Sequence, residues 1–126
     1  MKKILFLIFL MSAQTAFSDD AKNEWHNTTI SEATIEKIQA AKYEYKKCVG
    51  GEMQKSVNQQ QDTRKATDAI MKYCESVLAK MRVVYSDAKV PDVIADRHLK
   101  QIRLQTTREA LQGMMFSEAS RKAGNK

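Results

Sequence analysis

Two cysteines constrain the fold of this chain more than any other feature of its sequence. Cys48 and Cys74 are the only cysteines, and Gln61 lies midway between them in the polar stretch NQQQD at 58–62. In an antiparallel helical hairpin, residues equidistant from the turn lie side by side, because the two helices are neighbours joined by a short connection. The sequence therefore predicts a hairpin closed by a structural Cys48–Cys74 disulfide, as is common in exported chains.

Apolar residues recur at steps of three and four in three segments, which is the period of an amphipathic α-helix. The first set is Ile38, Ala41, Tyr45, Cys48, Val49, Met53 and Val57; the second is Ala66, Ile70, Cys74, Val77, Met81 and Val84; the third is Ala95, Leu99, Ile102, Thr106, Ala110 and Met114. No alternating apolar and polar run is long enough for a sheet. We therefore expect an all-α fold, in which the disulfide-pinned antiparallel hairpin and a third helix form a small bundle.

Three local patterns mark the expected helix boundaries. The stretch TISE at 29–32 has the spacing of a capping box, in which two side chains satisfy each other's free backbone N–H groups. Asp62 is placed to cap the second helix. Pro91 suits the first turn of the third helix, where its missing N–H costs nothing.

The pair Gly50-Gly51 follows Cys48 within the first periodic segment. Each interior glycine costs a helix about 1 kcal/mol relative to alanine. If the helix ended here, residues 50–62 would form a loop that is long for a helical hairpin. We therefore expect the helix to continue through both glycines to Met53 and Val57, with a hinge or a close-packing groove as the functional alternative.

The N-terminus has the pattern of a cleavable signal peptide over residues 1–18. Lys2 and Lys3 precede an apolar run at 4–11, and Ala16 and Ser18 lie three and one positions before a cut that would make Asp19 the first residue. The run is too short for a stable transmembrane anchor, although an uncleaved anchor is the alternative. We expect an irregular segment at 19–29, one three-helix domain at 30–120 and a frayed tail at 121–126.

Motifs for catalysis are absent from the sequence. The histidines His26 and His98 form no HExxH pair, and neither CxxC nor CxxCH occurs. His98 is best interpreted as an exposed or helix-packing side chain, because no partner motif accompanies it. The expectation is a protein that is not an enzyme and holds no cofactor.

Methionines raise one metal hypothesis, since copper(I) prefers soft ligands. Met114 and Met115 are the only adjacent pair, whereas Met53 and Met81 fall on the apolar stripes, where methionine fills core space. No MxxM or HxxM repeat is present. A copper carrier is therefore the least favoured of the functions considered, and no metal site is assigned.

Basic residues gather in the third helix. Arg97, Lys100, Arg103 and Arg108 fall within about 140° of helix circumference at ~100° per residue. Such a face suits an anionic lipid surface, an acidic protein or a polyanion, and a solvated face is the alternative. Without residues 1–18 the chain carries 19 basic and 15 acidic side chains, since only Lys2 and Lys3 are lost from 21 and 15. This net charge of +4 and the few aromatic residues among the cations make nucleic acid an unlikely partner.

Two stretches carry a resemblance. ATDAIMKYCE at 66–75 and VPDVIADRHLKQIRLQTTREAL at 90–111 resemble uncharacterised small exported helical proteins of proteobacteria, to which no function is assigned. The resemblance implies a bacterial envelope protein, located in the periplasm or released to the medium, and implies nothing about chemistry.

Two classes of function fit these observations. The first is a non-enzymatic binding or structural component of the bacterial envelope, whose partner is an envelope protein or an anionic surface. The alternative is a periplasmic chaperone or stress-response protein, since methionines adapt to varied apolar clients. The LTxxQ repeat of helical-hairpin envelope-stress chaperones is absent, and LQTTRE at 104–109 does not match it.

Overall fold

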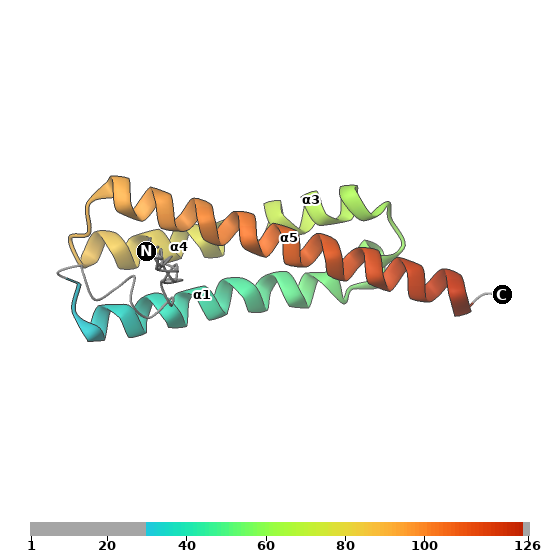
Figure 1. Cartoon of the computed structure of the whole chain (residues 1–126), viewed down its shortest axis with the longest axis horizontal. Helices are drawn as coiled ribbons and strands as arrows, with labels where there is room; N and C mark the ends of the chain where they lie inside the picture. Colours follow the sequence, from blue (N-terminus) through green and yellow to red (C-terminus); the bar gives the residue numbers. More distant parts are fainter. Residues whose placement is uncertain (1–29, 125–126) are drawn as a thin grey trace, which may run out of the picture.

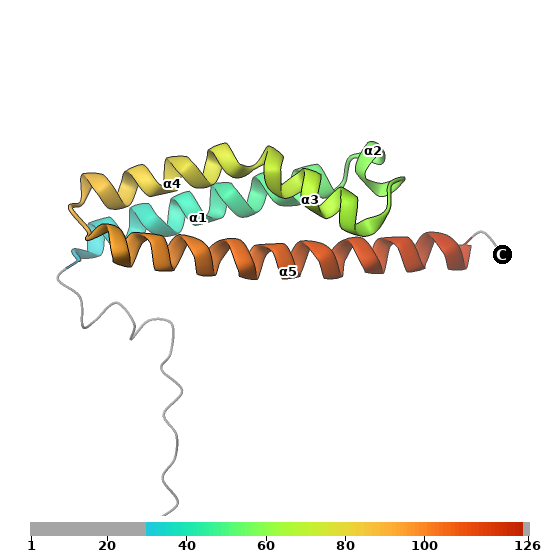
Figure 2. The same ribbon diagram turned by 90° about the horizontal axis from the view of Figure 1, so that it is seen from above.

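The computed structural model describes residues 30–124, and these residues form helices and no strand. The elements are α1 (Glu32–Met53), α2 (Ser56–Gln59), α3 (Thr63–Tyr73), α4 (Glu75–Asp87) and α5 (Asp92–Gly124). α1 and α5 are long rods, and α3 and α4 follow each other end to end as a third rod packed against both (Figures 1 and 2). This arrangement confirms the all-α class and the hairpin with a third helix. It differs from the three predicted helices because the second rod is broken at Cys74 and because α2 lies within the connection.

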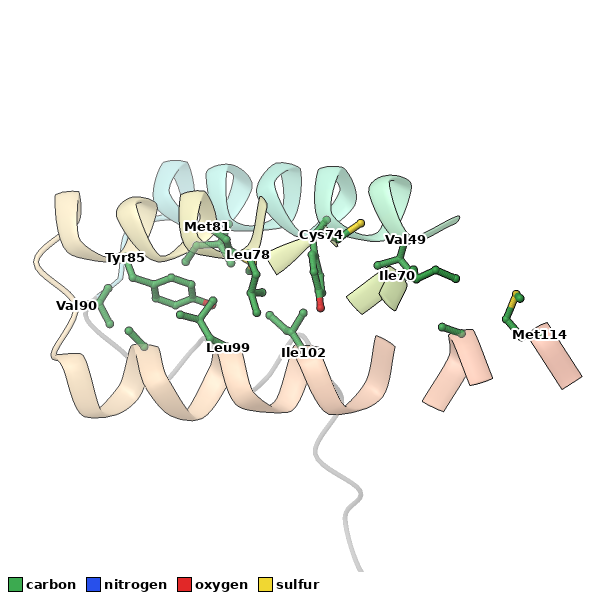
Figure 3. Packing of buried hydrophobic residues seen from close by; sticks show 14 of the residues in the cluster. Val49, Ile70, Cys74, Leu78, Met81, Tyr85, Val90, Leu99, Ile102 and Met114 are labelled. Carbon is green, nitrogen blue, oxygen red and sulfur yellow. The ribbon is translucent and has the colours of Figure 1, made fainter. Parts of the chain in front are cut away.

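One apolar core runs along the bundle between the three rods. All six positions predicted for the third helix are buried, namely Ala95, Leu99, Ile102, Thr106, Ala110 and Met114. Figure 3 shows Leu99 and Ile102 of α5 pointing toward Tyr85 and Leu78 of α4. The inner side of α5, as we call these six residues, therefore holds α5 against the other rods.

The second rod is interrupted at Cys74, and two of its buried residues differ from the prediction. Cys74 has φ −85° and ψ 0°. It is the C-cap residue of α3 and also the N-cap residue of α4. Beyond it the core receives Leu78 and Tyr85, whereas the predicted Val77 and Val84 are only half-buried. Met81 is buried as predicted, so only the choice between adjacent residues differs: steps of four, three and four from Cys74 replace the predicted steps of three, four and three.

The end of α1 departs from the prediction in its last turn. α1 continues through Gly50 and Gly51 as expected but ends at Met53, and Val57 is 59% exposed in α2. The side-chain amide of Asn58 donates to the backbone oxygen of Glu52 at 2.7 Å, and that of Gln59 donates to the Met53 oxygen at 3.3 Å. The polar turn thus satisfies carbonyls that a helix end leaves open, which is why Asn58 is buried in place of Val57.

The other helix ends show one misplaced cap, one correct cap and a proline that lies one residue before the helix instead of in its first turn. Ser31, and not Thr29, caps α1, because the helix begins at Glu32 and the Ser31 hydroxyl accepts from Thr34 N at 3.2 Å. Asp62 accepts from the N–H groups of Arg64 and Lys65, as predicted. Pro91 precedes α5 directly, and its carbonyl accepts from Ile94 N and Ala95 N.

α5 continues to Gly124 and therefore passes residue 120, where the predicted domain ends. An ion pair between Lys122 and Glu118, one turn apart at 2.8 Å, supports this last stretch. The predicted signal peptide at 1–18 and irregular segment at 19–29 lie outside the described residues.

Candidate functional site

The disulfide forms where the sequence predicts it. Cys48 of α1 and Cys74 at the α3–α4 junction are joined, with their Cα atoms 5.9 Å apart. Cys74 is fully buried and Cys48 half-buried. Because both cysteines of the chain are consumed, this bond is a crosslink between two rods and supplies no free thiol for chemistry.

The glycines of α1 have no packing role that the structure shows. A Cβ built on Gly50 or Gly51 meets nothing within 4 Å, and neither residue has a positive φ. The close-packing groove is therefore wrong as an explanation, and the hinge stays a hypothesis. Gly113 is the glycine that does make a close approach, since its Cβ would lie 2.5 Å from the Met53 Cε. The sequence reasoning missed this contact between α1 and α5.

The remaining candidates for chemistry take part in packing. The ring of His98 packs edge-on against Tyr85, with ring centroids 6.0 Å apart, as expected for a helix-packing histidine. Met114 is 3% exposed in the core, whereas Met115 is 56% exposed on the other side of the helix, so the pair does not converge on one site. Among residues 30–124, no group of three or more His, Cys, Asp and Glu side chains is placed to hold a metal ion.

The predicted basic face divides into two parts. Arg103 is turned toward α4, where its guanidinium pairs with Glu75. Arg97, Lys100 and Arg108 instead line a shallow open surface together with Leu104 and two glutamines, Gln101 and Gln105. These three cations form no ion pair with any carboxylate in the described part of the chain.

The carboxylates of α5 lie on its flanks and are neutralised there. Asp96 pairs with Arg82 of α4, and this hydrogen bond raises the pKa of the Arg82 guanidinium. Glu109 pairs with Lys46 of α1 at 3.0 Å. Near the end of the helix, hydrogen bonds from Lys122 and then Thr63 lower the pKa of Glu118. The side of α5 that faces away from the bundle is therefore positive, with no carboxylate in its middle.

Exposed apolar side chains lie on this same side of α5. Val93, Leu104 and Met115 are all exposed, and each is separated from the next by eleven residues. Eleven residues make about three turns of α-helix, so the three side chains form one line along the rod. Arg97 and Arg108 repeat at the same interval.

The outer face of α5 is defined here as Val93, Arg97, Lys100, Leu104, Arg108 and Met115. Sequence reasoning found its cations but missed its apolar line, because periods of three and four select the residues of the core. The eleven-residue spacing was the available signal. In Figure 2, α1, α3 and α4 all lie on one side of α5, and no helix of residues 30–124 covers its opposite side.

Comparison of the chain with protein-family models, with curated proteins and with solved structures gives no match. None of the helices in residues 30–124 has the length and apolar character needed to cross a bilayer. The function is therefore argued from the chain's own residues, and the outer face of α5 is the candidate site.

Proposed function

We propose that this protein is an exported, non-enzymatic helical bundle that docks on a component of the bacterial envelope through the outer face of α5. The observation that carries the proposal is the contrast among the charged groups of α5. Its carboxylates and Arg103 are paired with neighbouring helices or within the helix, whereas Arg97, Lys100 and Arg108 point outward beside exposed Leu104. A face with unpaired charge and exposed apolar groups suits a binding partner.

Export is supported by two independent features. The Cys48–Cys74 disulfide is typical of proteins that fold in an oxidising compartment. The N-terminal sequence has the charged, apolar and small-residue order of a signal peptide. Together they favour the periplasm, with release to the medium as the alternative.

A non-enzymatic role is supported by the environment of the reactive side chains. The cysteines are crosslinked, His98 packs against Tyr85, and the candidate face consists of cations and apolar groups without a nucleophile. These features favour binding over catalysis.

The proposal is tested by photo-crosslinking in cells that export the protein. A photoreactive amino acid replaces Leu104 on the outer face, and in a matched variant it replaces Val83 on α4. The two residues are 49% and 54% exposed, so they sample solvent to similar extents. We expect an adduct to an envelope protein or to lipid from position 104, read by gel and by mass spectrometry, and none from position 83. Equal adducts from both positions, or none from position 104, would contradict docking through this face.

A further inference from the structure

We propose that the component bound by the outer face of α5 is the surface of a lipid bilayer that contains anionic phospholipid, with α5 lying parallel to that surface. This inference rests on the proposed function and names its partner. It is argued from the straightness of the apolar line, from the charges beside it and from what the opposite side of the bundle presents.

The shape of the face suits a plane. Val93, Leu104 and Met115 stay close to one line, because eleven residues at ~100° each advance the helix by three turns and only about 20° more. Figure 2 shows α5 as a straight rod along one complete side of the bundle. A partner helix in a left-handed coiled coil would instead require apolar residues repeating every seven residues, alternating steps of three and four. The outer face of α5 does not have that pattern, so a flat surface fits it better than a helical partner.

The chemistry of the face suits a lipid headgroup region. Leu104 lies between cations, with Lys100 one turn before it and Arg108 one turn after it. Lysine and arginine extend their charged ends past apolar neighbours toward phosphate groups while the apolar side chains enter the acyl boundary.

Charge complementarity favours the anionic surface over a neutral one. Bringing α5 to such a surface presents three unpaired cations, and the exposed carboxylates nearest to them, Asp96 and Glu109, are already paired with Arg82 and Lys46. Each cation near an anionic bilayer contributes about fivefold to partitioning. Three cations therefore contribute on the order of 100-fold.

The opposite side of the bundle provides the internal control. Lys47 and Lys80 line a groove between α1 and α4, where Glu44 and Glu52 are also present. Lys37, two turns before Glu44 on α1, is exposed as well. These three lysines form no ion pair among the described residues. Replacing these three lysines by glutamate therefore changes the net charge of the protein by the same amount as replacing the three cations of the outer face. The change lies on the opposite side of the bundle.

The experiment measures vesicle co-sedimentation of the oxidised protein purified after export. Its N-terminus is verified by mass spectrometry, because the apolar run at residues 4–11 would itself bind lipid. The vesicles are phosphatidylcholine with or without phosphatidylglycerol. The variants are Arg97→Glu/Lys100→Glu/Arg108→Glu and the control Lys37→Glu/Lys47→Glu/Lys80→Glu, and thermal unfolding of each checks that the fold is retained.

We expect binding that requires phosphatidylglycerol and weakens with added salt, since screening reduces the attraction of exposed charges. The outer-face variant should lose more than about 100-fold in partitioning, because each reversal removes an attraction and adds a repulsion. The control variant should bind much more strongly than the outer-face variant. Equal losses in the two variants would overturn the lipid inference. If the vesicles do not bind while Leu104 crosslinks to one protein in cells, the lipid inference fails and the proposed function stands. If both readouts are negative, both fail.

Discussion

The two sides of α5 carry two different patterns. On the inner side, buried residues follow one another at steps of three and four from Ala95 to Met114, and they face two other rods. On the outer side, exposed apolar residues follow at steps of eleven and are interleaved with cations that no neighbouring helix pairs. One helix therefore carries the core contacts on its inner side, and its outer side is the face to which we assign the proposed docking role.

The largest expected effect on the free energy of unfolding comes from the Cys48–Cys74 disulfide, which joins the two rods against which α5 packs. The variant Cys48→Ala/Cys74→Ala lacks this disulfide, which closes a loop across a separation of 26 residues. Its unfolded chain therefore gains conformational entropy. On the chain-entropy model this lowers the free energy of unfolding by about 3.5 kcal/mol. Urea denaturation of the variant and of the oxidised protein measures the difference. An unchanged transition midpoint would contradict a stabilising role for the disulfide.

A second prediction compares the two sides of α5 directly. Ile102 is buried and Leu104 is 49% exposed, although only one residue separates them. Ile102→Ala should lower the free energy of unfolding by about 3 kcal/mol, because it leaves a cavity between the rods. Leu104→Ala should change it by less than about 0.5 kcal/mol. Similar losses of stability in the two variants would refute the division of α5 into an inner and an outer side.

A third prediction concerns where α5 approaches α1. Gly50→Ala and Gly51→Ala should each raise stability by about 1 kcal/mol, because alanine favours the helix and nothing lies near the new Cβ. Gly113→Ala should gain less or lose stability, since its Cβ requires Met53 to move. Thermal unfolding at equal concentration ranks the three variants. A destabilised Gly50→Ala protein would point to a structural requirement at that position that the packing does not show.

The last prediction is a pH dependence in the core beside the inner side of α5, which has no effect at neutral pH. Burial, and then the charge of Glu75, raise the pKa of Tyr45 to about 12, with Arg103 opposing them. The folded state therefore keeps the phenol neutral while the unfolded chain ionises above pH 10. The stabilisation is present below pH 10 and is lost as the pH rises toward 12. Tyr45→Phe should remove this part of the alkaline loss in a pH series of denaturation curves; an identical series would contradict the assignment.

Most of the fold follows from the sequence, because the helical period and the symmetric placement of the two cysteines about the turn can both be recognised without the structure. The inner side of α5 is predicted correctly at every position, since no break interrupts that helix. The second rod is predicted less well, because steps of three and four from Cys74 allow either member of an adjacent pair, and the core takes Leu78 and Tyr85. The prediction that Val57 lies on the apolar stripe of the first helix is wrong, because α1 ends at Met53 and the side-chain amides of Asn58 and Gln59 bind its last carbonyl groups. Such side-chain hydrogen bonds to the backbone are not visible in the hydropathy pattern.

The candidate site could be predicted only in part. The cations of α5 are visible in the sequence. However, Arg103 differs from the other three because it forms an ion pair with Glu75 of α4. Gly113 likewise acquires its role only when α1 brings Met53 against it. Both effects depend on contacts between distant segments, which periodicity within one segment does not contain.

The central claim, that the outer face of α5 docks the protein on the envelope, is tested most directly by fractionating cells that export it. The measurement is the share of protein that stays with envelope membranes after gentle lysis, for the unaltered chain and the two triple charge reversals. We expect Arg97→Glu/Lys100→Glu/Arg108→Glu to move into the soluble fraction while Lys37→Glu/Lys47→Glu/Lys80→Glu stays with the membranes. Retention of the outer-face variant at the level of the unaltered protein would contradict the claim.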